Sequence, residues 1–350
     1  MKKLNKDLGN IMMILGAVIG AGLASGQEIV IFFAQYGFVS IVFAFLFFAL
    51  FAYGLTQFLK YGKFTSKNPD FLKKYPKNFI FESCEGVIFL IFSSTMVAGA
   101  ESLLNEFVCK FDFKLWSILI LLLAVIVASK GLKWMVNVNK ILVPLIIVTT
   151  IIVCCLSFSF SPHSDIAFSF DFSNLAFLSV SCILYAACNL MVVNKITTEL
   201  GSKLSDKKIK KVAIISSCIL FLIIALIIIS LLVNDNSLLF VDLPMIYLAF
   251  MIHPNVGFVY AAIILVCIFT TLISTLYSLT GCIKVKIKSN FLPYIISAVI
   301  TFALSLFGFD SIVRYSYPLI GALGVVMIFN IKNRMTCEEY ACGENYCALK

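Results

Sequence analysis

Long apolar stretches separated by short polar segments run through the whole chain. A helix needs roughly 20 apolar residues to cross a bilayer. Ten stretches meet this length, at 9–34, 38–60, 80–106, 114–130, 136–160, 173–194, 210–234, 256–281, 291–309 and 311–331. The pattern predicts an all-α polytopic membrane protein with ten transmembrane helices and short loops.

Composition and charge agree with this interpretation. The 350 residues are 61% hydrophobic and only 13% charged, whereas a soluble domain carries about 25% charged residues. Lysine and arginine concentrate on the cytoplasmic side of membrane proteins. If the N-terminus is cytoplasmic, all of the 27 basic residues but Lys110, Lys114 and Arg314 fall in cytoplasmic segments. We therefore expect both termini in the cytoplasm, a location in the cytoplasmic (inner) membrane, and a net charge of +9 that reflects topology rather than nucleic-acid binding.

The first apolar stretch has an unusual interior. Small and polar residues recur there, namely Gly16, Gly20, Gly22, Ser25, Gly26 and Glu28. Glycine costs about 1 kcal/mol relative to alanine in a helix, and a charge at bilayer depth costs more. Ser25 and Glu28 have the spacing of a capping box, which predicts that a second helix begins there. A break at this depth must be buried in protein or line a cavity, and secondary transporters bind substrates and ions at such breaks.

The stretches divide into two halves of five. We expect a first repeat at 1–160, an outer linker at 161–172 and a second, inverted repeat at 173–331. The sixth stretch should then be broken like the first, although its centre at 179–189 has small and polar residues but neither glycine nor proline. Residues 235–255 are predicted to form a helical outer loop, and 332–350 a cytoplasmic tail.

The 12 cysteines do not predict a metal or disulfide framework. Nine lie in or beside apolar stretches, where cysteine acts as a small apolar residue. The other three, Cys337, Cys342 and Cys347, have a spacing that matches no common zinc site, and cytoplasmic thiols stay reduced. We expect no metal centre and no organic cofactor.

The segment 16–29, GAVIGAGLASGQEI, resembles the first-helix signature of the YkvI-type membrane proteins, a branch of the amino acid–polyamine–organocation superfamily. The resemblance extends to chain length, the ten-span layout and the Thr270-Thr271 pair in the eighth stretch. It implies the LeuT-type fold of two inverted five-helix repeats, with a substrate site between breaks in the first and sixth helices. It also implies an Na⁺ site, formed by the carbonyls of Gly16 and Ile19 with the hydroxyls of Thr270 and Thr271.

The candidate substrate-binding residues lie on two stretches. They are Gly20, Ala21, Gly22, Ser25 and Gly26 on the first and Tyr185 and Asn189 on the sixth. Free N–H groups near Gly22–Gly26 would bind a substrate carboxylate, and carbonyls near Gly20 would bind its ammonium group. Asn189 could equally satisfy backbone groups of its own helix.

Three charged residues are candidates for a gate or a proton site: Glu28, Glu101 and Arg314. A Glu28–Arg314 pair would close the outer vestibule. The alternatives are that Glu28 only caps a helix, that Glu101 is interfacial, and that Arg314 pairs with Asp310 four residues earlier. Protons on Glu28 or Glu101 are the alternative coupling ions to Na⁺. In proton-coupled proteins of the resembled fold, a lysine ammonium on the fifth helix can take the place of Na⁺. Here the only lysine of the fifth stretch, Lys140, lies too near its inner end to do so, which favours Na⁺.

These features favour a secondary transporter that works by alternating access, couples to Na⁺ and moves a small zwitterionic solute such as an amino acid. An uncoupled channel would need a continuous polar lining, and a membrane enzyme would need converging acids, histidines or cysteines. No nucleotide-binding motif indicates direct ATP drive. The expected partners are a small-molecule substrate and the lipid bilayer.

Overall fold

A computed structural model describes residues 2–68, 79–110, 114–130, 132–160, 174–284, 289 and 291–347. The predicted linker at 161–172 lies outside these residues. All the secondary structure described is helical. In chain order it comprises α1 (Lys2–Val18), α2 (Ala21–Ser25), α3 (Gln27–Phe32), η1 (Ala34–Val39), α4 (Ser40–Lys67), α6 (Phe79–Phe107), α7 (Leu115–Ala128), α8 (Leu132–Phe160), α9 (Leu175–Gly201), α10 (Asp206–Val233), η2 (Asn236–Phe240), α11 (Pro244–Ile252), α12 (Pro254–Lys284), α13 (Leu292–Ser305) and α14 (Phe309–Cys347).

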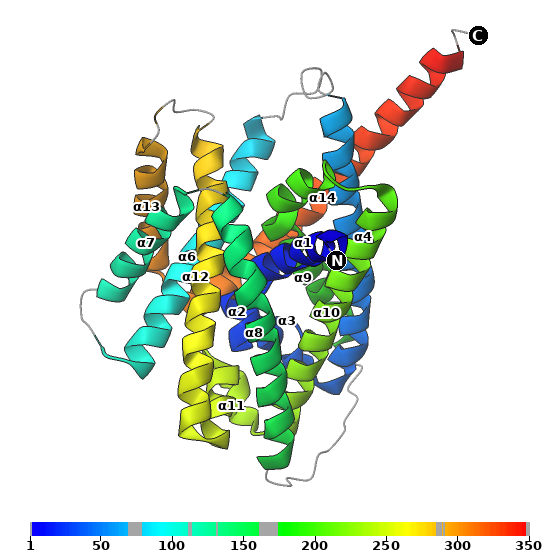
Figure 1. Cartoon of the computed structure of the whole chain (residues 1–350). Coiled ribbons are helices and arrows are strands. Elements are labelled where there is room, and N and C mark those ends of the chain that lie inside the picture. The colour runs from blue at the N-terminus through cyan, green and yellow to red at the C-terminus, as the bar shows by residue number, and fades with distance from the viewer. Residues whose placement is uncertain are drawn as a thin grey trace.

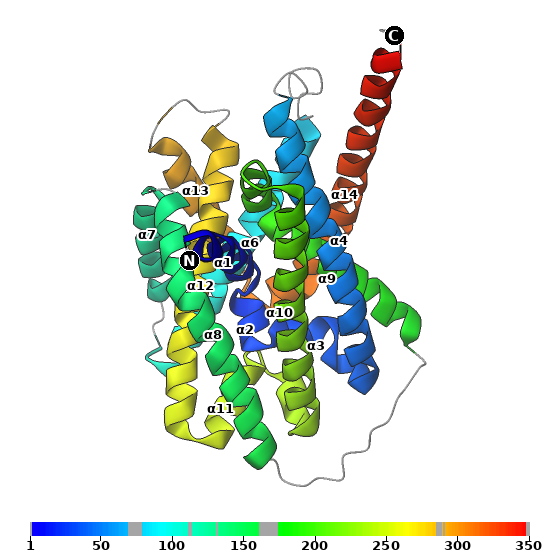
Figure 2. The ribbon, with the colours of Figure 1, turned by 45° about the vertical axis from the view of Figure 1, so that its right-hand side comes forward.

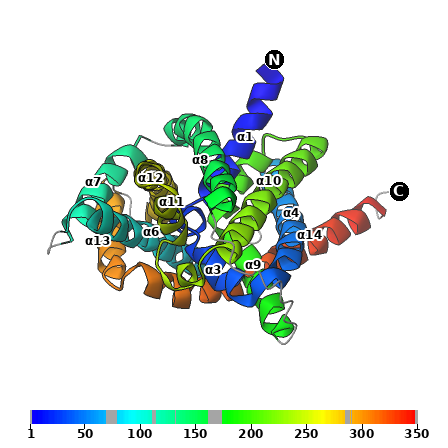
Figure 3. The same cartoon turned by 90° about the horizontal axis from the view of Figure 1, so that it is seen from below.

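The helices form an upright bundle. In the described chain, 7 helices are long and apolar enough to cross a membrane, and three shorter apolar helices lie at Asp7–Val18, Leu115–Ala128 and Leu292–Ser305. The all-α membrane architecture is confirmed, whereas the count of ten crossings remains a prediction. The long helices α4, α8, α10 and α12 run side by side (Figures 1 and 2), while α1 and the end of α14 extend outward (Figure 3).

Three helix ends lie at one end of the bundle. The end of α4, the end of α12 and the C-terminal end of α14 point to the top of Figure 1, whereas α11 lies at the bottom. The prediction that the top faces the cytoplasm stays a prediction.

The first helix is interrupted twice. It ends at Val18, and Gly20 is extended with φ −100° and ψ −164°. After the short α2, Gly26 adopts the left-handed conformation, φ 86°, which suits glycine, and α3 then begins. A second helix begins here as predicted, but without a capping box. Gly26, not Ser25, is the N-cap of α3. The Ser25 hydroxyl donates to the Gly22 carbonyl oxygen at 3.3 Å and accepts from the Gln27 N–H at 3.4 Å.

The predicted break in the sixth helix is also wrong. α9 is continuous over 27 residues. It contains neither proline nor an internal glycine, so every residue can keep a helical conformation without cost. The Asn189 amide donates to the Tyr185 carbonyl oxygen at 3.0 Å, one turn earlier in the same helix. Its side chain therefore supports α9 itself.

α9 packs mainly against α4 and α14. Two glycines allow the backbones of α4 and α9 to touch. A Cβ atom on Gly62 would lie 2.0 Å from the Thr198 carbonyl oxygen, and one on Gly201 would lie 2.0 Å from that of Leu59. In lipid, where the hydrophobic effect does not drive helices together, small residues let two helices approach closely and gain van der Waals packing.

The segment 235–255 contains η2 and α11, and Pro244 occupies the first turn of α11. α11 packs on α12 and reaches the break in the first helix, where a Cβ on Gly26 would lie 2.9 Å from Met245 Cγ. The predicted tail continues α14 as a helix to Cys347. The side chains of Cys337, Cys342 and Cys347 lie outside the described part, so the prediction about their chemistry stays open.

Candidate functional site

A buried carboxylate occupies the break in the first helix. Glu28 lies in the first turn of α3 and is only 5% exposed. Its side chain folds back over α2, so a Cβ atom on Gly22 would lie 2.1 Å from Glu28 Oε1. The Tyr185 hydroxyl of α9 donates to Glu28 Oε2 at 3.0 Å. Gly22 therefore makes room for Glu28, and α9 holds the carboxylate there.

A second tyrosine faces the same carboxylate from α14. Tyr317 is 1% exposed, and its hydroxyl points toward Glu28 and Thr95 without forming a hydrogen bond of normal geometry to a described residue. Its ring packs on Phe92, with centroids 5.1 Å apart. A buried hydroxyl without a partner costs about 1–3 kcal/mol, so this hydroxyl has hydrogen-bonding capacity left.

Aromatic rings of α3, its C-terminal end and α4 pack around Tyr185. The ring of Tyr185 lies 5.0 Å from Phe32, 5.4 Å from Phe33 and 5.2 Å from Phe47, measured between centroids. Electron-rich ring faces favour cations, and their edges and faces also pack well against apolar groups. Tyr185 thus joins the Glu28 carboxylate to a buried aromatic cluster.

Side chains of α12 satisfy the carbonyl groups freed by the break. Thr271 Oγ1 donates to the Gly16 carbonyl oxygen at 3.4 Å, and Cys267 Sγ donates to that of Ile19 at 2.6 Å. Tyr260 Oη donates to the Ala24 carbonyl oxygen at 2.9 Å. The carbonyl groups of Gly16 and Ile19 therefore face α12, and the ion site itself stays a prediction.

The two threonines of the predicted ion site differ. Thr271 reaches α1, whereas the Thr270 hydroxyl donates to the Cys267 carbonyl oxygen of its own helix at 2.9 Å. Sequence reasoning missed Cys267 and Tyr260. Cys267 and Thr271 are four residues apart and share one face of α12, so the helical spacing was the signal that could have found the cysteine.

The remaining predicted substrate residues surround this centre. A Cβ on Gly20 would lie 3.2 Å from Thr271 Cγ2, so Gly20 lies close to α12. Ser25 and Gly26 form the turn between α2 and α3. The side chain of Ala21 is outside the described part. Asn189 is directed at its own helix, as described above.

Glu101 is not placed as a gate or proton site. Its Oε2 accepts hydrogen bonds from the backbone N–H of Ser117 at 2.6 Å and from the Ser117 hydroxyl at 2.8 Å. The Asn105 amide donates to its Oε1 at 2.8 Å. Glu101 therefore caps the N-terminus of α7, whose first-turn N–H groups have no partner within the helix.

Arg314 lies against Asp310 rather than Glu28, so the Glu28–Arg314 gate stays a prediction. Arg314 Nη2 lies 3.2 Å from Asp310 Oδ1, which is the local alternative. Asp310 Oδ1 also accepts from Gln27 Nε2 at 2.8 Å. These three residues line an outer cavity of about 270 Å³ together with Asp242. The Glu28 side chain is buried and contacts Tyr185 instead of Arg314.

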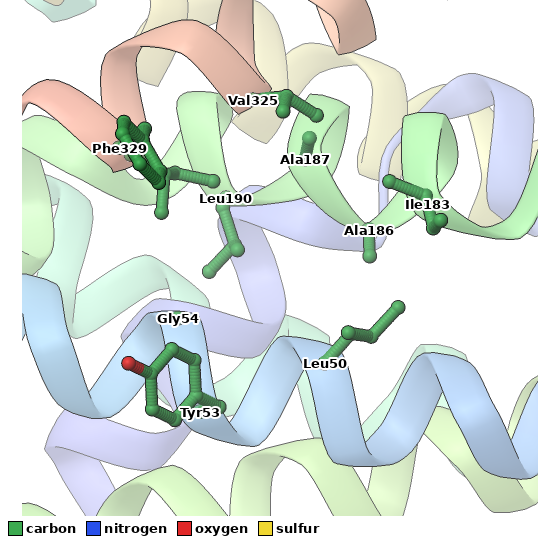
Figure 4. Close-up of a pocket in the computed structure, with 10 residues that line it drawn as sticks. Leu50, Tyr53, Gly54, Ile183, Ala186, Ala187, Leu190, Val325 and Phe329 are labelled. Atoms are coloured by element: carbon green, nitrogen blue, oxygen red, sulfur yellow. The ribbon is translucent and has the colours of Figure 1, made fainter. Parts of the chain in front are cut away.

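Another pocket, drawn in Figure 4, is apolar and lies between α4, α9 and α14. Leu50 and Tyr53 of α4 face Ile183, Ala186 and Leu190 of α9 across it, and Val325 and Phe329 close it from α14. It offers almost no polar group for orienting a polar solute. The break around Glu28 remains the candidate site.

The chain is similar over most of its length to two bacterial proteins, one of them described as a membrane protein. The uncharacterised membrane protein YkvI of Bacillus subtilis (strain 168) is 29% identical over 337 residues, which cover 90% of this chain and 92% of YkvI. The uncharacterised protein YyaD of the same organism is 25% identical over 330 residues, covering 91% and 94%. No family model matches the chain. The resemblance to the YkvI-type proteins is confirmed.

Two solved structures share the architecture. MhsT in complex with L-phenylalanine superposes with a TM-score of 0.70 at 20% identity, over 92% of this chain and 87% of MhsT. Mhp1, a nucleobase-cation-symport-1 family transporter with bromovinylhydantoin bound, gives 0.62 at 14% identity, over 92% and 76%. The fold is of the LeuT type. Of the two helices predicted to be broken, only the first is interrupted, because α9 is continuous.

Proposed function

We propose that the protein is a secondary transporter of the cytoplasmic membrane, with cytoplasmic termini, that moves a small solute bearing an amino group by alternating access. The observation that carries the proposal is the glycine-interrupted first helix, whose break buries Glu28 between α9 and α14. Intramembrane acids at broken helices mark substrate and ion pathways.

The substrate we expect is an amino acid. MhsT, of the same fold, is bound to L-phenylalanine. The expected orientation, with the substrate carboxylate at Gly22–Gly26, is disfavoured because Glu28 Oε1 already lies against Gly22. Two carboxylates sharing one buried site repel each other. The ammonium group is therefore the end that faces the break.

Na⁺ coupling at Gly16, Ile19, Thr270 and Thr271 is the second part of the proposal. It is supported by the contact of Thr271 with the Gly16 carbonyl oxygen, and by the Ile19 carbonyl oxygen turned toward α12. Hard cations take oxygen ligands of this kind. Proton coupling through Glu28 is the alternative.

Uptake into proteoliposomes with an imposed gradient tests the proposal. The purified protein is reconstituted and given a mixture of labelled amino acids with an inward Na⁺ gradient, an inward proton gradient or neither. The Na⁺ proposal expects saturable uptake that follows the Na⁺ gradient and falls in the Thr270→Val/Thr271→Val variant. Uptake that follows only pH and survives the double change would assign coupling to protons. Flux that does not saturate and ignores both gradients would indicate a channel.

A further inference from the structure

Glu28 is an acid without a basic partner. The titratable side chains that act on it or that it acts on come from three helices, namely Tyr185 and Cys188 of α9, Cys267 of α12 and Tyr317 of α14. Within the described chain, no lysine, arginine or histidine is among them. The carboxylate thus lies in a neutral surrounding.

Such a group has two low-energy states. An isolated carboxylate in a low-dielectric interior is too costly to persist, so it is either protonated or paired with a cation. Tyr185 hydrogen bonds to one oxygen, Oε2. Tyr317 presents a buried hydroxyl with no normal hydrogen bond to a described residue. The site therefore has unused capacity both for charge and for a hydrogen-bond donor.

We propose that Glu28 is the counter-ion of the substrate's ammonium group, and that the substrate class is primary amines with an apolar body, with or without a carboxylate. This inference rests on the proposed transport function and deepens it. Two N–H groups of the ammonium donate hydrogen bonds to the Glu28 carboxylate. The third N–H donates a hydrogen bond to the Tyr317 oxygen. Binding of R–NH₃⁺ to the protonated acid forms the carboxylate–ammonium pair and releases one proton to solvent, so the charge of the site is unchanged.

The surroundings favour an organic cation over a metal ion. A hard metal cation takes about six or more oxygen ligands, whereas this place offers one carboxylate and two phenol oxygens. The rings of Phe32, Phe33 and Phe47 gather around Tyr185. An ammonium group gains from ring faces, and the apolar body of an amine gains from the same rings by packing.

Three probes with a common body separate the two ends of the substrate. L-phenylalanine has both charges, phenethylamine has only the amine, and 3-phenylpropionate has only the carboxylate. Calorimetry and thermal unfolding of the purified full chain should show binding of the first two and not of the third. Glu28→Gln should weaken phenethylamine binding at least 100-fold, whereas Glu199→Gln, which changes an exposed acid of α9, should leave it unchanged. Comparable binding of 3-phenylpropionate and phenethylamine, or phenethylamine binding to Glu28→Gln within about twofold of wild type, would overturn the proposal. The same holds if none of phenethylamine, butylamine and cadaverine binds the wild type.

Proton release gives a readout that a merely structural role of Glu28 would not move. Titration of phenethylamine at pH 5, in two buffers of different ionisation enthalpy, should report close to one proton released per amine bound. Binding that releases no proton anywhere in the range from pH 5 to 8 would contradict the exchange.

Tyr317→Phe isolates the second hydroxyl. If the hydroxyl only fills space, its removal leaves both thermal stability and binding unchanged, which would remove Tyr317 from the proposal. If it accepts from the amine, the variant should unfold no earlier than wild type and bind phenethylamine about 5- to 10-fold more weakly. Tyr315→Phe, at an exposed position of the same helix, is the matched control.

Failure of the counter-ion and failure of transport give different results. Glu28-dependent amine binding without uptake into vesicles would leave the counter-ion proposal standing and remove the transport function. Saturable amino-acid uptake that is intact in Glu28→Gln would do the reverse.

Discussion

Gly22→Ala perturbs the candidate site with the smallest possible change. The added Cβ would lie 2.1 Å from Glu28 Oε1, 2.4 Å from Cγ and 2.6 Å from Cδ. These are atoms of one side chain, so the backbone can stay in place while Glu28 moves away. The displacement breaks the hydrogen bond from Tyr185, which joins the acid to α9.

The magnitudes follow from these contacts. In the unliganded protein Glu28 is protonated, and a hydrogen bond between neutral groups contributes about 0.5–1.5 kcal/mol to stability. Alanine in place of glycine in a helix returns about 1 kcal/mol. The stability of the variant should therefore stay within about 0.5 kcal/mol of wild type, so folding is not prevented. If the displaced carboxylate also loses its grip on the ammonium group, the dissociation constant rises about 10- to 100-fold, which equals about 1.4–2.8 kcal/mol.

The assay compares apparent melting temperature and phenethylamine affinity in detergent. Gly86→Ala is the control because a Cβ there would lie 3.9 Å from Cys282 Cβ, an ordinary contact. That variant should bind normally and melt at or slightly above the wild-type temperature. Wild-type affinity in Gly22→Ala would refute the placement of Glu28 in the binding site. A full loss of folded protein would refute the argument that only the side chain must move.

Three further outcomes are expected. Glu101→Gln should lower the free energy of unfolding by about 0.5–2 kcal/mol, seen as a lower apparent melting temperature, because it weakens the cap at Ser117. Ligand affinity should not change, and an unchanged melting temperature would contradict the capping role. Thr271→Val should raise the Na⁺ concentration needed for half-maximal uptake about 10-fold, and more than Thr270→Val does, because only Thr271 reaches α1; equal effects in uptake assays would contradict this ranking. Asp242→Asn should raise stability slightly at pH 7 and not at pH 4, because partial desolvation and then Asp310 raise the pKa of Asp242, which disfavours the charged form only above the ordinary aspartate pKa of about 4; a pH-independent effect in melting scans would exclude this cause.

Much of the fold could be predicted because apolar length and glycine content are local properties. The predicted stretch 256–281 corresponds to α12 at Pro254–Lys284, and the glycine cluster marks the interrupted first helix. In the sixth helix, the residues themselves were the better guide. They contain no internal glycine or proline, and α9 is continuous, whereas the division into two inverted halves and the resemblance had both implied a break.

The errors at the site come from tertiary contacts. Ser25 and Glu28 have capping-box spacing, but the left-handed Gly26 turns α3 so that Glu28 meets Tyr185, 157 residues later. The partner of Glu101 is Ser117, at the start of a different helix. Spacing along one helix carries no information on such pairs, because they depend on how two helices are placed relative to each other.

Counterflow in proteoliposomes tests the central claim, that the break at Gly22 and Glu28 is the substrate site of a transporter, most directly. Vesicles loaded with unlabelled L-phenylalanine or phenethylamine are diluted into trace amounts of the labelled compound, with wild type and Gly22→Leu at equal protein content. We expect transient, saturable accumulation of label with wild type. The leucine variant, whose side chain fills the place of the Glu28 carboxylate, should remain folded and show no accumulation. Equal accumulation by both proteins, or label entry that is not stimulated by internal substrate, would contradict the account.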